Sequence, residues 1–253
     1  MSNEILPRLI GRGVLSGALA GLVSGGFAFF VAEPVMDRAV ELEGRRSEAA
    51  DKAAGITPEA MEEMFTRSEQ HLGLILATVG AGIAFGVLFS VMYWALFHRT
   101  AATRPWERSL GLAGAVFTGF WLLPFIRYPA NPPGVGDPES LGSREYGWTA
   151  SIAIGLITVF VAWRLATSLA DRPKHVRQPA AVALVVVATA LLFLLPDNTD
   201  PLPVPAGLLW DFRVLAAASS TILWTFLGAA FGYLGVRDAR RSRTAPAATE
   251  VGV

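Results

Sequence analysis

The sequence predicts an all-α fold: a polytopic membrane helix bundle of about six transmembrane helices with both termini in the cytoplasm. The first observation is composition, because 53% of the 253 residues are hydrophobic and only 17% are charged, which is too apolar for an ordinary soluble domain. The second is that the apolar residues form blocks of about 17 to 25 residues, long enough to cross about 30 Å of hydrocarbon. The third is the distribution of Lys and Arg between alternate loops.

We predict a single transmembrane domain over residues 1–243, with a disordered tail at 244–253. Arg8 and Arg12 precede the first apolar block, as in a signal peptide, but no small-residue cleavage site follows before Glu33-Pro34, so we interpret this block as a retained span. The predicted spans run approximately over 13–32, 72–97, 109–126, 148–169, 180–196 and 212–236.

The basic residues set the predicted orientation, because cytoplasmic loops of membrane proteins carry the excess of Lys and Arg. With the N-terminus inside, most of the 21 basic residues fall on cytoplasmic segments, namely Arg8, Arg12, Arg99, Arg104, Arg108, Arg164, Arg172, Lys174, Arg177, Arg237, Arg240, Arg241 and Arg243. The acidic residues gather instead on the predicted outer loops. Two interpretations stay open: a negative outer mouth that concentrates cations, or acidic loops that only keep the protein hydrated.

Two local patterns predict further structure. Gly13, Gly17, Gly21 and Gly25 form a stripe on one face of the first span, and Gly82/Gly86 and Gly228/Gly232 repeat the spacing, which is typical of closely packed membrane helices. Thr57-Pro58-Glu59 has the features of a helix start, so we predict an outer helical extension over about residues 58–71 that leads into the second span.

Motifs of known enzyme classes are missing from the sequence. There is no H-E-x-x-H, no G-x-S-x-G, no dinucleotide fingerprint and no Walker A loop, and the chain has no cysteine for a disulfide, a thiolate metal site or a nucleophile. We therefore predict that the protein is not an enzyme and that it does not itself use ATP. Nothing in the sequence predicts a bound cofactor or a nucleic-acid partner.

The candidate metal ligands are Glu33, His71, Asp197 and Asp200, all on the predicted outer side. Imidazole and carboxylate groups together suit Co²⁺, Ni²⁺ or Zn²⁺. His71 stands at the outer end of the second span without a second ligand at chelating spacing, so Glu33 or the aspartates of the last outer loop must complete a site. The other interpretation is that His71 has an interfacial structural role.

Two proline-rich outer loops, over 125–137 and 196–205, are predicted to be stiff and non-helical. Arg127 and Arg213 flank these loops at the ends of the third and sixth spans. They either extend to the membrane interface or pair with Asp197 or Asp211 to clamp the loops, and such a clamp competes with metal binding for the carboxylates.

These loops resemble the signature of the CbtA family, the large membrane subunit of a predicted cobalt transporter. The first motif that carries the resemblance is the run from Arg127 to Gly136, which includes Tyr128, Asn131 and Pro132 and is followed by Arg144 and Tyr146. The others are Leu195-Pro-Asp197, the run Leu209-Trp-Asp-Phe-Arg213, which includes Asp211, and Val31-Ala-Glu-Pro34. The resemblance extends from the first span through Gly232.

The resemblance implies a Co²⁺ uptake permease of the bacterial plasma membrane, linked to cobalamin supply. It also implies a small single-span CbtB-type partner with a histidine-rich end, while the chain itself is either single or a homo-oligomer. The choice of cobalt over nickel depends entirely on the resemblance. The alternative function is a membrane scaffold or interaction protein that binds partner helices without transporting metal, which agrees with the near absence of ionisable residues within the spans.

Overall fold

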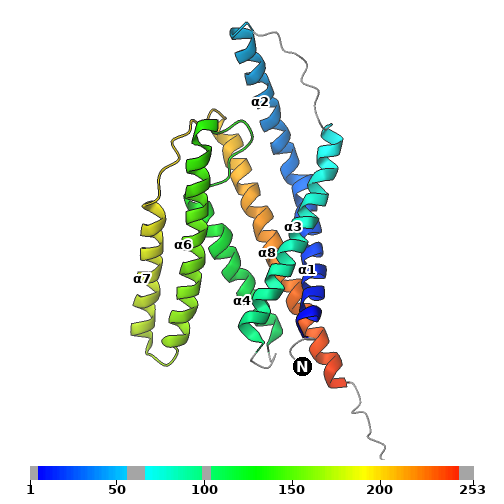
Figure 1. The fold of residues 1–253 in the computed structure, drawn as a ribbon, viewed down its shortest axis with the longest axis vertical. Helices are drawn as coiled ribbons and strands as arrows, with labels where there is room; N and C mark the ends of the chain where they lie inside the picture. Colours follow the sequence, from blue (N-terminus) through cyan, green and yellow to red (C-terminus); the bar gives the residue numbers. More distant parts are fainter. Residues whose placement is uncertain (1–4, 56–65, 99–103, 245–253) are drawn as a thin grey trace, which may run out of the picture. The chain divides into compact units, whose positions relative to one another are not determined.

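A computed structural model describes residues 5–55, 66–98 and 104–244, and within these ranges the chain is helical without any strand. The helices are α1 (Ile5–Phe27), α2 (Glu33–Ala53), α3 (Arg67–Phe97), α4 (Pro105–Val116), α5 (Leu123–Arg127), α6 (Leu141–Ser168), α7 (Lys174–Phe193) and α8 (Ala206–Thr244) (Figure 1). Two π-helical turns, η1 (Ala28–Ala32) and η2 (Phe117–Leu122), join α1 to α2 and α4 to α5, and a 3₁₀ turn, η3 (Pro138–Ser140), precedes α6.

The prediction of six membrane-spanning helices is confirmed by length and composition. The helical segments that are long and apolar enough are Ile5–Ala53, Glu69–Phe97, Pro105–Arg127, Leu141–Ser168, Lys174–Phe193 and Ala206–Arg241. Residues 128–137 and 196–205 are non-helical, as predicted for the two proline-rich loops. The prediction is wrong for residues 125–127, which form the end of α5. Most of the predicted extension at 58–71 and nearly all of the predicted tail at 244–253 lie outside the described residues.

The first helix does not end near residue 32, as predicted; after η1 it continues as α2 to Ala53. Pro34 occupies the first turn of α2, where a missing N–H costs little. The π-helical turn η1 connects α1 to α2 without a break. Within it the N–H of Glu33 bonds to the carbonyl of Ala28, five residues back instead of four. The helix therefore accommodates Pro34 and extends beyond the predicted end of the first span at residue 32.

The chain divides into two compact units, which are described separately. The first unit comprises Met1–Ser24, Ile75–Gly114 and Ile222–Val253, and the second comprises Gly25–Leu74 and Ala115–Thr221.

In the first unit, α1 and α3 pack backbone against backbone. A Cβ atom added to Gly13 or Gly17 would collide with the carbonyl of Gly86 or Gly82, respectively, so no side chain fits between the two helices. The hydroxyl of Ser90 on α3 donates a 2.8 Å hydrogen bond to the carbonyl of Leu9 on α1. The glycine stripe thus serves close helix packing, as the spacing predicts.

A second contact in the first unit joins α4 to α8. Ser109 donates a 2.7 Å hydrogen bond to the carbonyl of Gly228, and a Cβ at Gly228 would lie 2.6 Å from the Cβ of Ala113. Phe231 of α8 is fully buried against Phe89 of α3, with ring centroids 5.0 Å apart. Small residues again allow the close approach, and aromatic rings fill the remaining space.

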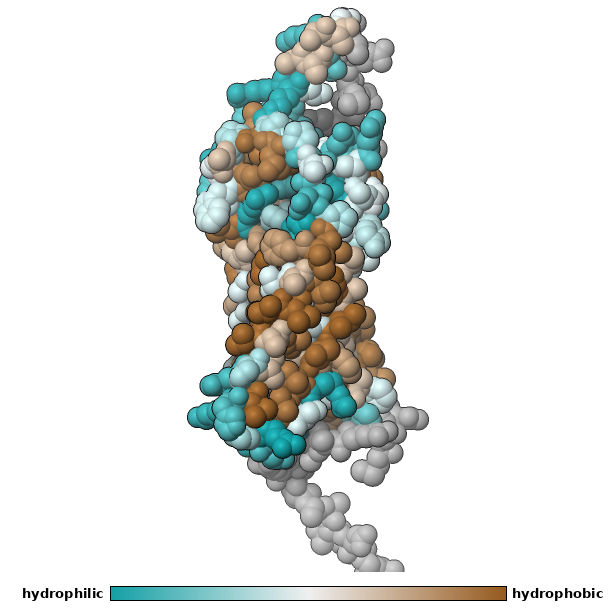
Figure 2. All heavy atoms as spheres, turned by 90° about the vertical axis from the view of Figure 1, so that its left-hand side faces the viewer, coloured by the Kyte–Doolittle hydropathy of each residue, from teal (hydrophilic) through white to brown (hydrophobic). Residues whose placement is uncertain are grey.

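In the second unit, α6 packs against η2 and α7. Gly119 of η2 meets Gly155 of α6 so closely that a Cβ at either position would contact the backbone of the other. The face formed by α6 and α7 carries a band of apolar side chains with hydrophilic residues at both ends, as Figure 2 shows. Exposed residues on this face include Val182, Val186 and Phe160, which is the arrangement expected of helices that face lipid.

Candidate metal site and loop clamp

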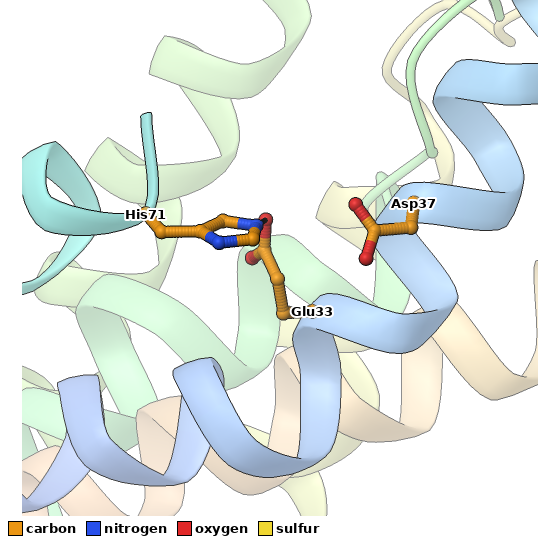
Figure 3. A group of neighbouring side chains, drawn as sticks. All are labelled: Glu33, Asp37 and His71. Carbon is orange, nitrogen blue, oxygen red and sulfur yellow. Dashed lines mark ion pairs between the residues drawn. The ribbon is translucent and has the colours of Figure 1, made fainter. Parts of the chain in front are cut away.

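A three-residue cluster of potential metal ligands lies in the second unit, where the first turns of α2 approach the first turns of α3. Glu33 and Asp37 are four residues apart on α2, and His71 comes from α3 (Figure 3). One ligand atom from each residue lies within 4.8 Å of the other two. Nε2 of His71 lies 3.1 Å from Oε1 of Glu33.

Helical geometry explains the position of the two carboxylates. Residues four apart face the same side of an α-helix, so Glu33 and Asp37 both project toward His71 only because the helix continues past Pro34. The ring of Phe29, in η1, packs edge-on against the imidazole of His71 with centroids 5.7 Å apart. The π-helical turn thus supplies both the support for the histidine and the start of the acidic turn.

Glu33 and His71 are partly buried, which favours a defined binding site over a chance approach of two surface side chains. The side chain of Glu33 is only 13% exposed and that of His71 is 31% exposed. Although Nε2 of His71 is buried and close to Glu33, it makes no hydrogen bond of acceptable geometry. A buried polar atom normally has a partner, so this nitrogen is available to bind one.

The donor set has the chemistry of a site for a divalent transition metal: one imidazole nitrogen and two carboxylates. Ligand atoms that share a metal ion at about 2.0–2.2 Å lie roughly 3.0–3.4 Å from one another. The His71–Glu33 separation already falls in this range. Asp37, whose side chain is exposed, has a carboxylate oxygen within 4.8 Å of the other two ligand atoms.

The other two predicted ligands, Asp197 and Asp200, are not part of this cluster. Both lie in the loop between α7 and α8, where they pair with arginines. Arg127 donates a 2.6 Å hydrogen bond to Asp197 and also bonds to the carbonyls of Leu192 and Leu195. The side chain of Arg127 is only 8% exposed, so this cation is held in the protein rather than extended toward the membrane interface.

Asp200 is more deeply enclosed than Asp197, with its side chain 5% exposed. Its Oδ2 atom accepts hydrogen bonds from the hydroxyl of Ser140 at 2.8 Å and the N–H of Asp137 at 3.2 Å. The Nε atom of Arg144 lies 3.4 Å away. Asp200 therefore connects its own loop, 196–205, to the end of the other proline-rich loop and to the start of α6.

The remaining motif residues complete this loop clamp. The hydroxyl of Tyr128 donates a 2.6 Å bond to the carbonyl of Pro196, and Pro132 is fully buried. Arg213 bonds to Asn131 Oδ1 at 2.9 Å and to the carbonyl of Ala130, so the expectation that it pairs with Asp197 or Asp211 is wrong. Asp211 instead lies 3.9 Å from Arg38 of α2 in an exposed ion pair.

The residues of the loop clamp belong to the motifs that were identified in the sequence. A family model described as "Probable cobalt transporter subunit (CbtA)" matches residues 6–235, which include both the ligand cluster and the clamp. The chain belongs to the CbtA family. No curated protein and no solved structure gives a significant match to it.

Membership of the CbtA family and six membrane-competent helices identify a multi-pass membrane protein of a cobalt transporter. The description as a subunit implies that another component works with the CbtA chain.

Asp37 is the member of the ligand cluster that sequence reasoning missed. The signal was its four-residue spacing from Glu33, but that spacing has meaning only on a helix, and the first span was predicted to end at residue 32. Because proline is tolerated in the first turn of a helix, a helix that starts at Glu33 could have been predicted, and Asp37 would then have joined the candidate ligands. Gly119 and Gly155, whose contact packs α6 against η2, were missed as well because they stand on different helices without a repeated spacing.

Proposed function

We propose that this CbtA chain is the membrane subunit for Co²⁺ uptake and that Glu33, Asp37 and His71 form the site at which the cation is first captured. The observation that carries the proposal is the convergence of three ligand groups from α2 and α3. In this view Co²⁺ is the transported substrate and not a resident cofactor. The chain has no catalytic role.

Two further features support capture at this place. The cluster uses an imidazole and carboxylates, which bind Co²⁺ more strongly than they bind the hard cations Mg²⁺ and Ca²⁺. Asp197 and Asp200 are engaged by Arg127 and Arg144, so they serve to hold the loops and leave metal capture to the cluster. This assignment changes the expected ligand set while it keeps the expected substrate.

The wider setting follows from the family resemblance. We propose that the chain lies in the bacterial plasma membrane with both termini in the cytoplasm and supplies cobalt for cobalamin synthesis. We propose a small single-span CbtB-type subunit as its partner, which delivers metal to the cluster. The chain contains no Walker A motif, so the energy for uptake has to come from a partner or from an ion gradient.

A scaffold role is the second candidate, and α2 is the observation that favours it. This helix exposes many charged side chains, Glu41 and Arg45 among them, and its Arg38 forms an ion pair with Asp211. Its Glu43 lies so near Gly134 that a Cβ at that glycine would be 3.0 Å from the Glu43 side chain. An anchored, charged helix is a suitable docking surface for another protein. The two candidates differ in whether loss of the ligand cluster abolishes transport.

The deciding experiment is cobalt uptake at submicromolar metal in cells that lack other cobalt importers. The chain is expressed alone and with the small partner, as wild type and as Glu33→Gln/His71→Ala. Glu48→Gln, which removes an exposed carboxylate farther along α2, is the matched control. Asp197→Ala/Asp200→Ala tests the ligand set expected from the sequence.

We expect uptake with wild type and Glu48→Gln and a loss of at least tenfold with Glu33→Gln/His71→Ala. If only the Asp197→Ala/Asp200→Ala protein, correctly folded and inserted, loses uptake, the capture site is on the loop and the cluster is wrongly assigned. If no form transports cobalt although all reach the membrane, the scaffold role replaces the permease.

A further inference from the structure

A pocket that the proposed function does not use opens in the first unit between the start of α4 and the last turns of α8. Its volume is about 420 Å³, and it is lined by Trp106, Tyr233, Val236, Arg237, Arg240 and Arg241. Trp106 comes from α4 and all the other residues come from α8. The pocket combines two aromatic rings with a group of three guanidinium groups.

The spacing of the α8 residues places them on one face of the helix. Positions 233, 236, 237, 240 and 241 follow the three- and four-residue steps that align side chains along a helix. The aromatic end of this face is open, since Trp106 is 40% exposed and Tyr233 is 63% exposed. The arginine end follows directly, so the face changes from aromatic to cationic within about two helical turns.

The charge around the pocket is strongly positive. Between residues 5 and 241 the described part of the first unit carries Arg8, Arg12, Arg104, Arg108, Arg237, Arg240 and Arg241 but only the carboxylates Glu107 and Asp238. Neither carboxylate lines the pocket. An anionic group in the pocket would therefore meet a surplus of cations.

The chemistry of the lining indicates what kind of anion fits. A guanidinium group can bind a phosphate through two parallel N–H···O hydrogen bonds. Trp and Tyr side chains prefer the headgroup level of a bilayer. The pocket lies along the last turns of α8, where the apolar stretch of the helix gives way to Arg237, Arg240 and Arg241. We propose that it binds the phosphate headgroup of an anionic phospholipid, with the acyl chains beside Trp106 and Tyr233.

The test measures lipid binding by the full-length protein, purified in a neutral detergent and titrated with phosphatidylglycerol or phosphatidylcholine. Bound lipid is counted by native mass spectrometry. The variant Arg237→Gln/Arg240→Gln/Arg241→Gln removes the three charges of the pocket. The matched control, Arg38→Gln/Arg45→Gln/Arg46→Gln, removes three charges from α2 in the second unit. A further arm adds millimolar inorganic phosphate to wild type.

We expect wild type and the α2 control to bind phosphatidylglycerol in preference to phosphatidylcholine and the pocket variant to bind it at least about tenfold more weakly. Equal binding by the pocket variant and the control, both with wild-type thermal unfolding, overturns the proposal. Displacement of the lipid by inorganic phosphate also overturns it, because the site then recognises free phosphate. Cobalt uptake plays no part in this readout.

Discussion

Nε2 of His71 on α3 lies 3.1 Å from Oε1 of Glu33 on α2, although each residue stands at the end of a different predicted span. Two helices therefore share one polar contact at the point where each leaves its apolar segment. Asp37 extends the contact to three groups that can bind a metal ion. The predictions below test this cluster, the loop clamp, the helix packing and the orientation of the chain.

Replacement of His71 by alanine should weaken Co²⁺ binding to the purified protein by at least about tenfold, or about 1.4 kcal/mol, because it removes the only nitrogen ligand of the cluster. Isothermal titration calorimetry of the full-length chain measures the change. His175→Ala, at the exposed start of α7, is the control and should bind as wild type does. Unchanged affinity in His71→Ala would remove the histidine from the site.

Asp37→Asn distinguishes the cluster from the ligand set expected from the sequence. We expect this variant to bind Co²⁺ more weakly, whereas Asp197→Asn should leave the affinity unchanged because Arg127 already engages that carboxylate. The same calorimetric titration compares the two. The opposite pattern would place the metal on the loop between α7 and α8.

Arg127→Gln should lower the stability of the protein without a direct effect on metal binding. Arg127 is buried and bonds to the carbonyls of Leu192 and Leu195 as well as to Asp197, so its loss leaves polar groups without partners at a cost of about 2–4 kcal/mol. Thermal unfolding in detergent reports this as a lower Tm. Arg45→Gln, an exposed residue paired with Glu41, should change stability by no more than about 0.5 kcal/mol.

Gly17→Ala should destabilise the packing of α1 against α3 by about 1–3 kcal/mol, because the new methyl group collides with the backbone at Gly82. Gly11→Ala is a close control on the same helix, since nothing lies within 4 Å of a Cβ at that position. Thermal unfolding of the two variants under identical conditions should separate them clearly. Equal Tm values would mean that α1 and α3 do not pack in this register.

The orientation can be tested by cysteine labelling because the chain has no native cysteine. With both termini in the cytoplasm, Ser47→Cys on α2 should react with a membrane-impermeant maleimide in intact cells. Ala170→Cys, between α6 and α7, should react only after the membrane is opened. The reverse pattern of labelling would invert the topology and place the ligand cluster on the cytoplasmic side.

The spans and their packing could be predicted from the sequence because both depend on local patterns. Apolar runs long enough to cross a bilayer are visible in any window, and the four-residue glycine spacing identifies the contact face of α1 without knowledge of its partner. The individual contacts, Gly13 with Gly86 and Gly17 with Gly82, could not be predicted. They depend on the register between two helices, which the sequence of one helix does not determine.

The ligand cluster was harder to predict than the spans. It depends on which carboxylates are already engaged by arginines in the folded protein and which can still bind a metal ion. Composition cannot separate Asp200, enclosed by Ser140 and Arg144, from Asp37, which is exposed beside Glu33. The partner of Arg213 was wrong for a related reason. Its charge suggested Asp197 or Asp211, whereas the folded loop presents the neutral side chain of Asn131.

The π-helical turn η1 has a geometric effect on the whole rod from Ile5 to Ala53. One extra residue within a turn advances every later side chain by about 100° around the helix axis, so the rod carries two differently phased faces. Glu33 and Asp37, which follow the turn, therefore meet His71 in a helical phase that an uninterrupted α-helix would not give them.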